Sequence, residues 1–86
     1  MEETRILVVD DEQEIADLLE LYLISDGYQV IKSGDALEGL AIMEREKIDL
    51  VLLDIMMPKM NGLAAVMKIR ETNIYRLLFY QRRPRK

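Results

Sequence analysis

Residues 50–58 read Leu-Val-Leu-Leu-Asp-Ile-Met-Met-Pro, an apolar run that contains a single carboxylate, Asp54. A second apolar run, Ile-Leu-Val-Val-Asp-Asp at residues 6–11, ends in two carboxylates, Asp10 and Asp11. Short continuous apolar runs are typical of strands that are covered on both faces of a parallel sheet. A carboxylate at the end of a buried strand is costly unless something compensates it. Two strands with this feature therefore indicate one shared acidic site.

Strand-like and helix-like segments alternate along the rest of the chain. The pattern predicts strands over residues 5–10, 28–32 and 48–53. Helices are expected after each strand, and the third is expected over about residues 63–72, after the loop that Pro58 and Gly62 indicate. Three successive βα units predict an α/β domain with a parallel sheet and helices on its faces.

The first two helices carry start and stop signals. Asp11 with Glu14, and Asp35 with Glu38, resemble capping boxes at the two helix starts. Gly27 is placed where a left-handed residue would end the first helix. That helix has one apolar stripe, formed by Ile15, Leu18, Leu19, Tyr22 and Leu23.

Ligands of parallel sheets bind at the carboxyl ends of the strands, where the strand order reverses. If the first and third strands are neighbours, Asp10, Asp11 and Asp54 meet at this edge. Three carboxylates so close require a cation, unless one of them takes up a proton. The 86-residue chain has no Cys and no His, which leaves oxygen ligands and favours a hard cation such as Mg²⁺. The sequence therefore predicts a Mg²⁺ site at Asp10, Asp11 and Asp54.

Simpler interpretations of these residues stay open. Asp11 could only cap the first helix, and this role is compatible with metal binding. Asp10 could end its strand for solubility alone, and Asp54 could be a loop carboxylate that accepts backbone N–H bonds.

The composition of the chain limits the functions that it can have. Half of the residues are hydrophobic, which fits one small globular domain, and no stretch approaches the length of a membrane span, so a cytoplasmic protein is expected. Residues 1–71 hold all 16 acidic and 7 of the 12 basic residues, whereas residues 72–86 hold only basic charge, five residues. An acidic body argues against direct nucleic-acid binding, although the basic end at residues 81–86 could contact phosphates or be a solvated terminus.

The motifs together resemble the receiver domain of bacterial two-component response regulators. The resemblance rests on the Asp10-Asp11-Glu12 run after a strand, on residues 52–58 and on Asn61-Gly62, and it covers about residues 4–74. It implies a flavodoxin-like three-layer fold, whose complete form has the strand order 2-1-3-4-5. The receivers most similar to this chain precede winged-helix DNA-binding domains, so DNA would be reached only through an output domain absent from this chain.

By this resemblance Asp54 is the phosphate acceptor. Asp10, Asp11 and Asp54 hold Mg²⁺ together with the backbone carbonyl of Met56, and Pro58 and Gly62 shape the adjoining loop. The phosphodonor would be a phosphohistidine on a partner histidine kinase, because this chain has no histidine and no Gly-rich phosphate loop. The chain is accordingly expected to be a phosphoacceptor and not an enzyme.

After about residue 74 the sequence departs from the receiver pattern. The family carries a Ser or Thr after the fourth strand and a Lys after the fifth, whereas this chain has neither Ser nor Thr after Thr72 and only the terminal Lys86. We therefore divide the chain into an incomplete receiver at residues 1–74 and a divergent basic tail at residues 75–86, with a possible fourth strand at 75–80.

An incomplete receiver leaves part of the apolar stripe of the first helix uncovered. Self-association through the exposed helix, or through an open sheet edge, is therefore expected. Three function classes remain: a phosphate-accepting signalling module, a fragment with a structural or assembly role, and a Mg²⁺-dependent phosphohydrolase. The last is disfavoured, because it would need a second acid two residues after its nucleophile and Met56 follows Asp54 there.

Overall fold

The computed structural model describes residues 4–54 and the backbone of residues 76–80. The elements follow the order β1 (Arg5–Val9), α1 (Gln13–Ser25), β2 (Gln29–Ser33), α2 (Ala36–Arg45), β3 (Leu50–Asp54) and β4 (Arg76–Tyr80). The strands form one parallel sheet with the order β2-β1-β3-β4, as the flavodoxin-like interpretation requires. The predicted third helix, over residues 63–72, lies outside the described residues.

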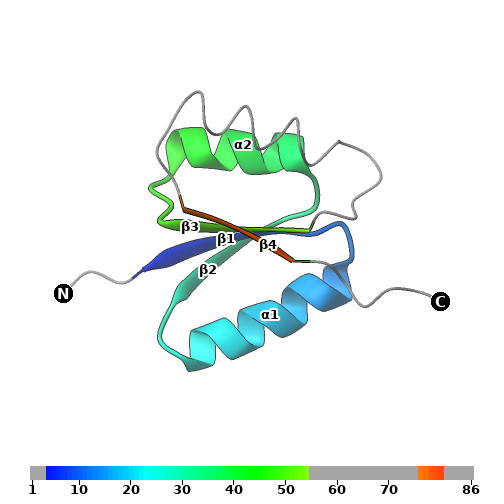
Figure 1. The fold of residues 1–86 in the computed structure, drawn as a ribbon, viewed down its shortest axis with the longest axis vertical. Helices are drawn as coiled ribbons and strands as arrows, with labels where there is room; N and C mark the ends of the chain where they lie inside the picture. Colours follow the sequence, from blue (N-terminus) through cyan, green and yellow to red (C-terminus); the bar gives the residue numbers. More distant parts are fainter. Residues whose placement is uncertain (1–3, 55–75, 81–86) are drawn as a thin grey trace.

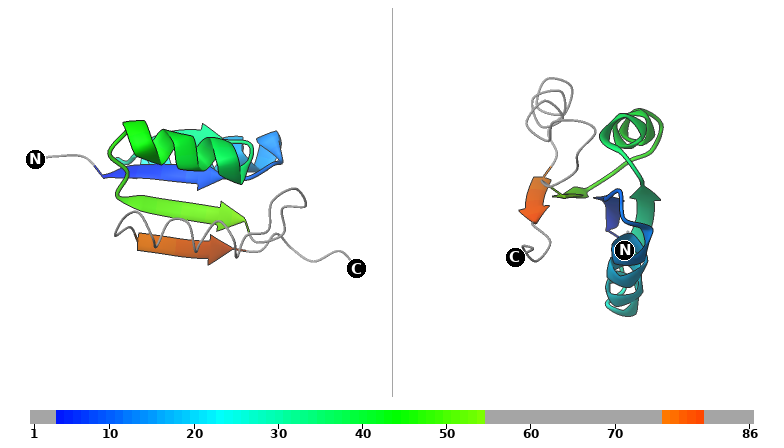
Figure 2. Two further views of the ribbon diagram at one scale, coloured as in Figure 1. Left: turned by 90° about the horizontal axis from the view of Figure 1, so that it is seen from above. Right: turned by 90° about the vertical axis from the view of Figure 1, so that its right-hand side faces the viewer.

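The two described helices lie on opposite faces of the sheet and make three layers (Figures 1 and 2). Side chains of β1 alternate between these faces, as period-two geometry requires. Leu7 and Val9 belong to the buried cluster on the α2 side, and Ile6 and Val8 belong to the cluster on the α1 side. Because both faces of β1 are covered, its continuous apolar sequence is explained.

Helix α1 ends as the sequence predicts. Gly27 has a φ of 96°, in the left-handed region that glycine adopts without steric cost. Its amide donates to the Ile24 carbonyl at 2.9 Å, and the Tyr28 amide donates to the Leu23 carbonyl at 3.1 Å. These two bonds form a Schellman motif, which satisfies carbonyls at the helix end. Tyr28 therefore completes the helix terminus, and β2 begins one residue later than predicted.

The helix starts were predicted with mixed success. At α2 the Asp35 carboxylate accepts a hydrogen bond from the Glu38 amide at 2.7 Å, which confirms the predicted cap. At α1 the prediction of Asp11 as the cap is wrong, because the cap residue is Glu12 and it makes no side-chain capping bond. The Asp10 carboxylate instead accepts the Glu12 amide at 2.8 Å and directs the chain into the helix.

Strand β3 begins two residues later than predicted and includes Asp54 as its last residue. Ile48 is buried in the cluster on the α2 side although it lies outside the strand. At this end of the sheet Asp49 and Arg5 bond reciprocally: the Asp49 amide donates to the Arg5 carbonyl, and the Arg5 amide donates to the Asp49 carboxylate, both at 2.9 Å. The apolar run that begins at Ile48 therefore predicted burial correctly, but it did not predict where the hydrogen bonding of β3 to its neighbours begins.

One flank of α1 is apolar and open to solvent. Lys32, on the edge strand β2, contacts the carboxylates of Asp17 at 2.6 Å and Glu20 at 2.7 Å, which fixes the outer flank of the helix. By helical spacing Leu18 and Tyr22 lie on the other flank, away from Asp17 and Glu20, and they are 49% and 66% exposed. Among the described elements, none lies beside α1 under β3 and β4 (Figure 2). Leu19 and Leu23 pack against the buried cluster on this side of the sheet, so the exposed members of the five-residue stripe are Leu18 and Tyr22.

Neither described helix is a membrane span. Within residues 4–54 and 76–80, none of the helices has the length and apolar character that crossing a bilayer requires.

Candidate metal and phosphate site

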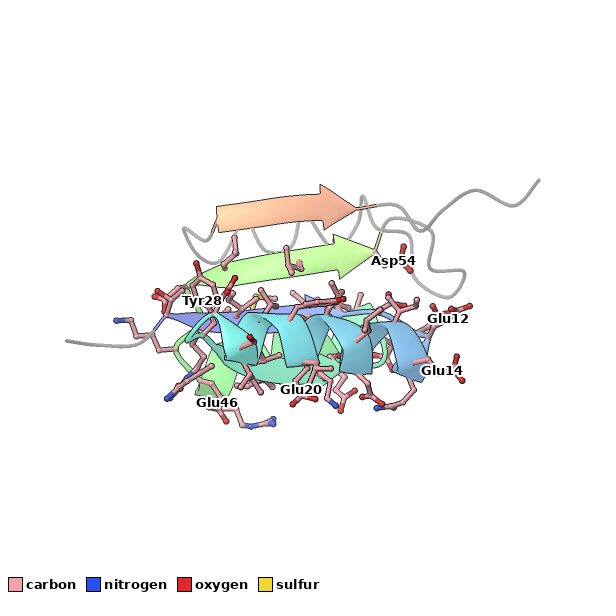
Figure 3. The ribbon with its side chains drawn as sticks, turned by 90° about the horizontal axis from the view of Figure 1, so that it is seen from below. Glu12, Glu14, Glu20, Tyr28, Glu46 and Asp54 are labelled. Atoms are coloured by element: carbon pink, nitrogen blue, oxygen red, sulfur yellow. The ribbon has the colours of Figure 1, made fainter. Side chains whose placement is uncertain are left out.

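The acidic site lies at the carboxyl ends of β1 and β3. These strands pair directly, with Val9 opposite Leu53, so the next residue in each chain is an aspartate, Asp10 and Asp54. Figure 3 shows Asp54 at the tip of β3, at the same end of the molecule as Glu12, whereas Tyr28 and Glu46 lie at the other end. The register of two buried strands thus brings the two carboxylates together.

Three carboxylates converge at this edge. One carboxylate oxygen from each of Asp10, Asp11 and Asp54 lies within 4.8 Å of the others. Asp10 is 2% exposed and Asp54 is fully buried, whereas Asp11 is exposed. The group therefore has two carboxylates fixed inside the protein and a third on the solvent side.

Local structure holds Asp10 from two directions. Its amide donates to the Ser33 carbonyl at 3.0 Å, which continues the β1–β2 ladder by one residue. One of its carboxylate oxygens accepts the Glu12 amide at 2.8 Å. Because an ionised carboxylate has two oxygens, each with more than one lone pair, Asp10 can support the turn and ligate a cation at the same time.

The donor set fits a hard divalent cation. Carboxylate oxygens are ligands that Mg²⁺ prefers, and a bound cation would offset the mutual repulsion of three nearby negative groups. Met56, Pro58 and Gly62, which the sequence analysis also assigned to the site, lie outside the described residues.

Sequence reasoning missed the turn that supports this site. Ser33, the last residue of β2, is 3% exposed, and its hydroxyl donates to the Asp35 carbonyl at 2.6 Å. The signal was a small polar residue between an apolar strand and a helix cap, which a search for carboxylates passes over.

Comparison with known proteins agrees with this geometry. Residues 6–79 match the family model described as the response regulator receiver domain. Regulatory protein VanR of Enterococcus faecium is 47% identical over 74 residues, which make up 86% of this chain and 32% of VanR. The chain thus spans about a third of the length of this curated relative.

Two solved structures are also similar. A chain in the complex of histidine kinase ThkA with response regulator protein TrrA gives a TM-score of 0.83 at 36% identity, over 88% of this chain and 66% of that chain. TrrA of Thermotoga maritima in complex with Mg(2+)-BeF gives 0.75 at 41% identity, over 79% and 59%. The chain belongs to the response regulator receiver domain family.

Proposed function

We propose that this chain accepts a phosphoryl group on Asp54 from the phosphohistidine of a partner histidine kinase, with Mg²⁺ held by Asp10, Asp11 and Asp54. The observation that carries the proposal is the convergence of three carboxylate oxygens within 4.8 Å at the carboxyl edge of the sheet. The backbone carbonyl of Met56 enters as a fourth ligand from the family resemblance alone. A kinase partner is supported by the similarity to the ThkA–TrrA complex, and Mg²⁺ is supported by the similarity to TrrA with Mg(2+)-BeF.

The reaction requires little beyond a positioned nucleophile. An oxygen of the Asp54 carboxylate attacks phosphorus, an O–P bond forms, and the P–N bond to the imidazole breaks. The imidazole keeps the electron pair of that bond and takes up a proton from solvent. Bound Mg²⁺ would neutralise the charge that develops when the phosphoryl group meets these carboxylates.

The residues of this chain contribute position and exclusion of water. Asp54 is fully buried at the end of β3, a strand that is paired on both sides, which limits the orientations of its carboxylate. Asp10 is fixed by the Ser33 carbonyl and the Glu12 amide, so its carboxylate is held close to that of the acceptor. Because the kinase supplies the activated phosphoryl group, this chain is an acceptor and not an enzyme in the proposal.

Beryllofluoride, a mimic of a bound phosphoryl group, provides the test. In thermal unfolding, beryllofluoride with Mg²⁺ is expected to raise the Tm of the wild-type chain by several degrees. The Asp54→Asn variant should show no rise beyond that with Mg²⁺ alone. An equal rise in both proteins would refute Asp54 as the acceptor.

Direct DNA binding is not part of the proposal. Residues 4–54 hold 13 acidic and 4 basic side chains, and this excess of negative charge repels a phosphate backbone. DNA would be reached through an output domain outside this chain.

A second candidate role is self-association, and the open flank of α1 favours it. Leu18 and Tyr22 are exposed on α1, and the half-buried Leu50 and Leu52 of β3 belong to the same side of the sheet as this helix. Burying such a surface against a second copy would remove apolar area from water. Sedimentation velocity should show dimers that Leu18→Gln weakens, whereas Leu21→Gln, on the solvent side of the helix, should not. A monomer at all concentrations would exclude this role.

A further inference from the structure

We propose that Ser33 is a positioning residue for the acidic site, acting through the backbone of Asp10. The inference rests on the proposed Mg²⁺ site and extends it to residues 33–38, which run from the last residue of β2 through the connecting turn into the first turn of α2. Three contacts connect this turn to the site.

The first contact is the main-chain bond at the end of β1. Val9 lies opposite Ser33 in the parallel register, and the Asp10 amide donates to the Ser33 carbonyl at 3.0 Å. The position of the Ser33 backbone therefore sets where Asp10 leaves the sheet.

The second contact fixes Ser33 itself. Its buried hydroxyl donates to the Asp35 carbonyl at 2.6 Å and lies 3.4 Å from a Glu38 carboxylate oxygen. The same Glu38 oxygen accepts the Gly34 amide at 3.1 Å, and the Glu38 amide donates to the Asp35 carboxylate at 2.7 Å. The Ser33 hydroxyl thus connects the end of β2 to the start of α2, where the Asp35 and Glu38 carboxylates accept backbone hydrogen bonds.

The third contact is the close approach of α2 to the same strands. A Cβ atom added at Gly39 would lie 3.1 Å from Cγ2 of Val9 and 3.6 Å from Oγ of Ser33. The first turns of α2 therefore lie close to Val9, the residue before Asp10, and to the Ser33 hydroxyl. Interiors packed this closely transmit a small displacement to their neighbours.

Groups that orient metal ligands usually change metal affinity by about 10- to 100-fold when they are removed. Because Ser33 acts through the main chain, a smaller effect is expected. Ser33→Ala should raise the Mg²⁺ dissociation constant about three- to tenfold. The Asp10 amide should also exchange its hydrogen faster, since its acceptor is less firmly held.

Isothermal titration with MgCl₂ and amide exchange by NMR, on folded protein, test these expectations. Ser33→Thr keeps the hydroxyl and, unlike Ser33→Ala, should retain the wild-type affinity for Mg²⁺. Glu38→Ala, at an exposed position, provides a second variant that weakens the same turn, and it should raise the dissociation constant in the same direction.

The matched control is Asp49→Ala, which removes the acceptor of the Arg5 amide at the opposite end of β1. It should lower stability but leave the Mg²⁺ dissociation constant within about twofold of wild type, because it does not touch Asp10. Equal affinities in wild type, Ser33→Ala and Glu38→Ala would overturn the role of Ser33, as would an equal loss in Asp49→Ala. Absence of Mg²⁺ binding by the wild-type chain would instead refute the proposed function.

Discussion

Asp10 and Asp54 are adjacent because they follow the paired residues Val9 and Leu53 of neighbouring parallel strands. Both are almost completely buried, at 2% and 0% exposure. Two carboxylates at such positions are unfavourable for folding by themselves, so their placement requires a compensating role. The site is thus a direct product of strand register.

Replacing Asp10 tests this compensation. Asp10→Asn keeps the side-chain oxygen that accepts the Glu12 amide and removes one negative charge. The free energy of unfolding without Mg²⁺ should therefore rise, by about 1 to 3 kcal/mol for a pair of nearby charges. Mg²⁺ at about ten times its wild-type Kd should stabilise wild type by about 1.4 kcal/mol and the variant by much less. Urea unfolding with and without MgCl₂ measures both effects, and a variant that is equally stabilised by Mg²⁺ would exclude Asp10 as a ligand.

The end of α1 gives a prediction about backbone conformation. Gly27→Ala should destabilise the protein by about 1 to 2 kcal/mol, because a side chain is strained at the φ of 96°. Gly34→Ala is the control, since an added Cβ there has open space around it and the φ is not positive. It should be neutral or slightly stabilising in the same urea titration. Equal losses at both positions would contradict the conformational explanation.

The packing of α2 against β1 gives a third prediction. Gly39→Leu should cost about 1 to 3 kcal/mol, because Val9 already lies 3.1 Å from the position of a Cβ. Ala41→Leu places the same side chain two residues on, at an exposed position of the same helix, and should change stability by less than about 0.5 kcal/mol. Thermal unfolding compares them, and a neutral Gly39→Leu would mean that α2 does not pack as closely as described.

The contacts of Lys32 predict a specific dependence of stability on pH. Its hydrogen bond to Asp17, and a second to Glu20, raise the pKa of Lys32 above 10.5. The bond to Lys32, and then that to Gln13, lower the pKa of Asp17 below 3.8. The stability that the Asp17 contact adds to the folded state is fully present above the pKa of Asp17 in the unfolded chain, and it is lost as the pH falls through the pKa in the folded protein. The stability that the Lys32 contacts add is fully present below the pKa of Lys32 in the unfolded chain, and it is lost as the pH rises through the pKa in the folded protein.

The stability difference between wild type and Lys32→Met should therefore be constant from about pH 5 to 9 and shrink at both extremes. Urea unfolding across this range measures it, with Arg45→Met, at an exposed position in the last turn of α2, as the control. A difference that changes mainly near neutral pH would contradict the assignment, since neither group titrates there.

The sequence predicts those features that depend on local chemistry. The left-handed conformation at Gly27 and the cap at Asp35 follow from residue type, and the meeting of Asp10 with Asp54 follows from strand order. The third strand was predicted to begin at Ile48, two residues too early, because an apolar side chain indicates burial and not a hydrogen bond to the neighbouring strand. The cap at α1 was misassigned because Asp10, one residue earlier, satisfies the helix start by a different bond.

Sequence reasoning missed Ser33 for a related reason. Its contacts join segments whose approach depends on the packing of α2 on the sheet, through Gly39. Tertiary placement of this kind leaves no periodic signal in the chain. The roles of Met56, Pro58 and Gly62, and the division of the chain at residue 74, stay predictions.

Intact-mass spectrometry after incubation with a small-molecule phosphodonor tests the central claim most directly. The chain should gain the mass of a single phosphoryl group in the presence of Mg²⁺, and it should gain none without the metal or in the Asp54→Asn variant. Circular dichroism of each sample confirms that the protein is folded. An adduct that forms equally in Asp54→Asn, or no adduct on folded wild-type protein, would contradict the assignment of Asp54 as the phosphoryl acceptor.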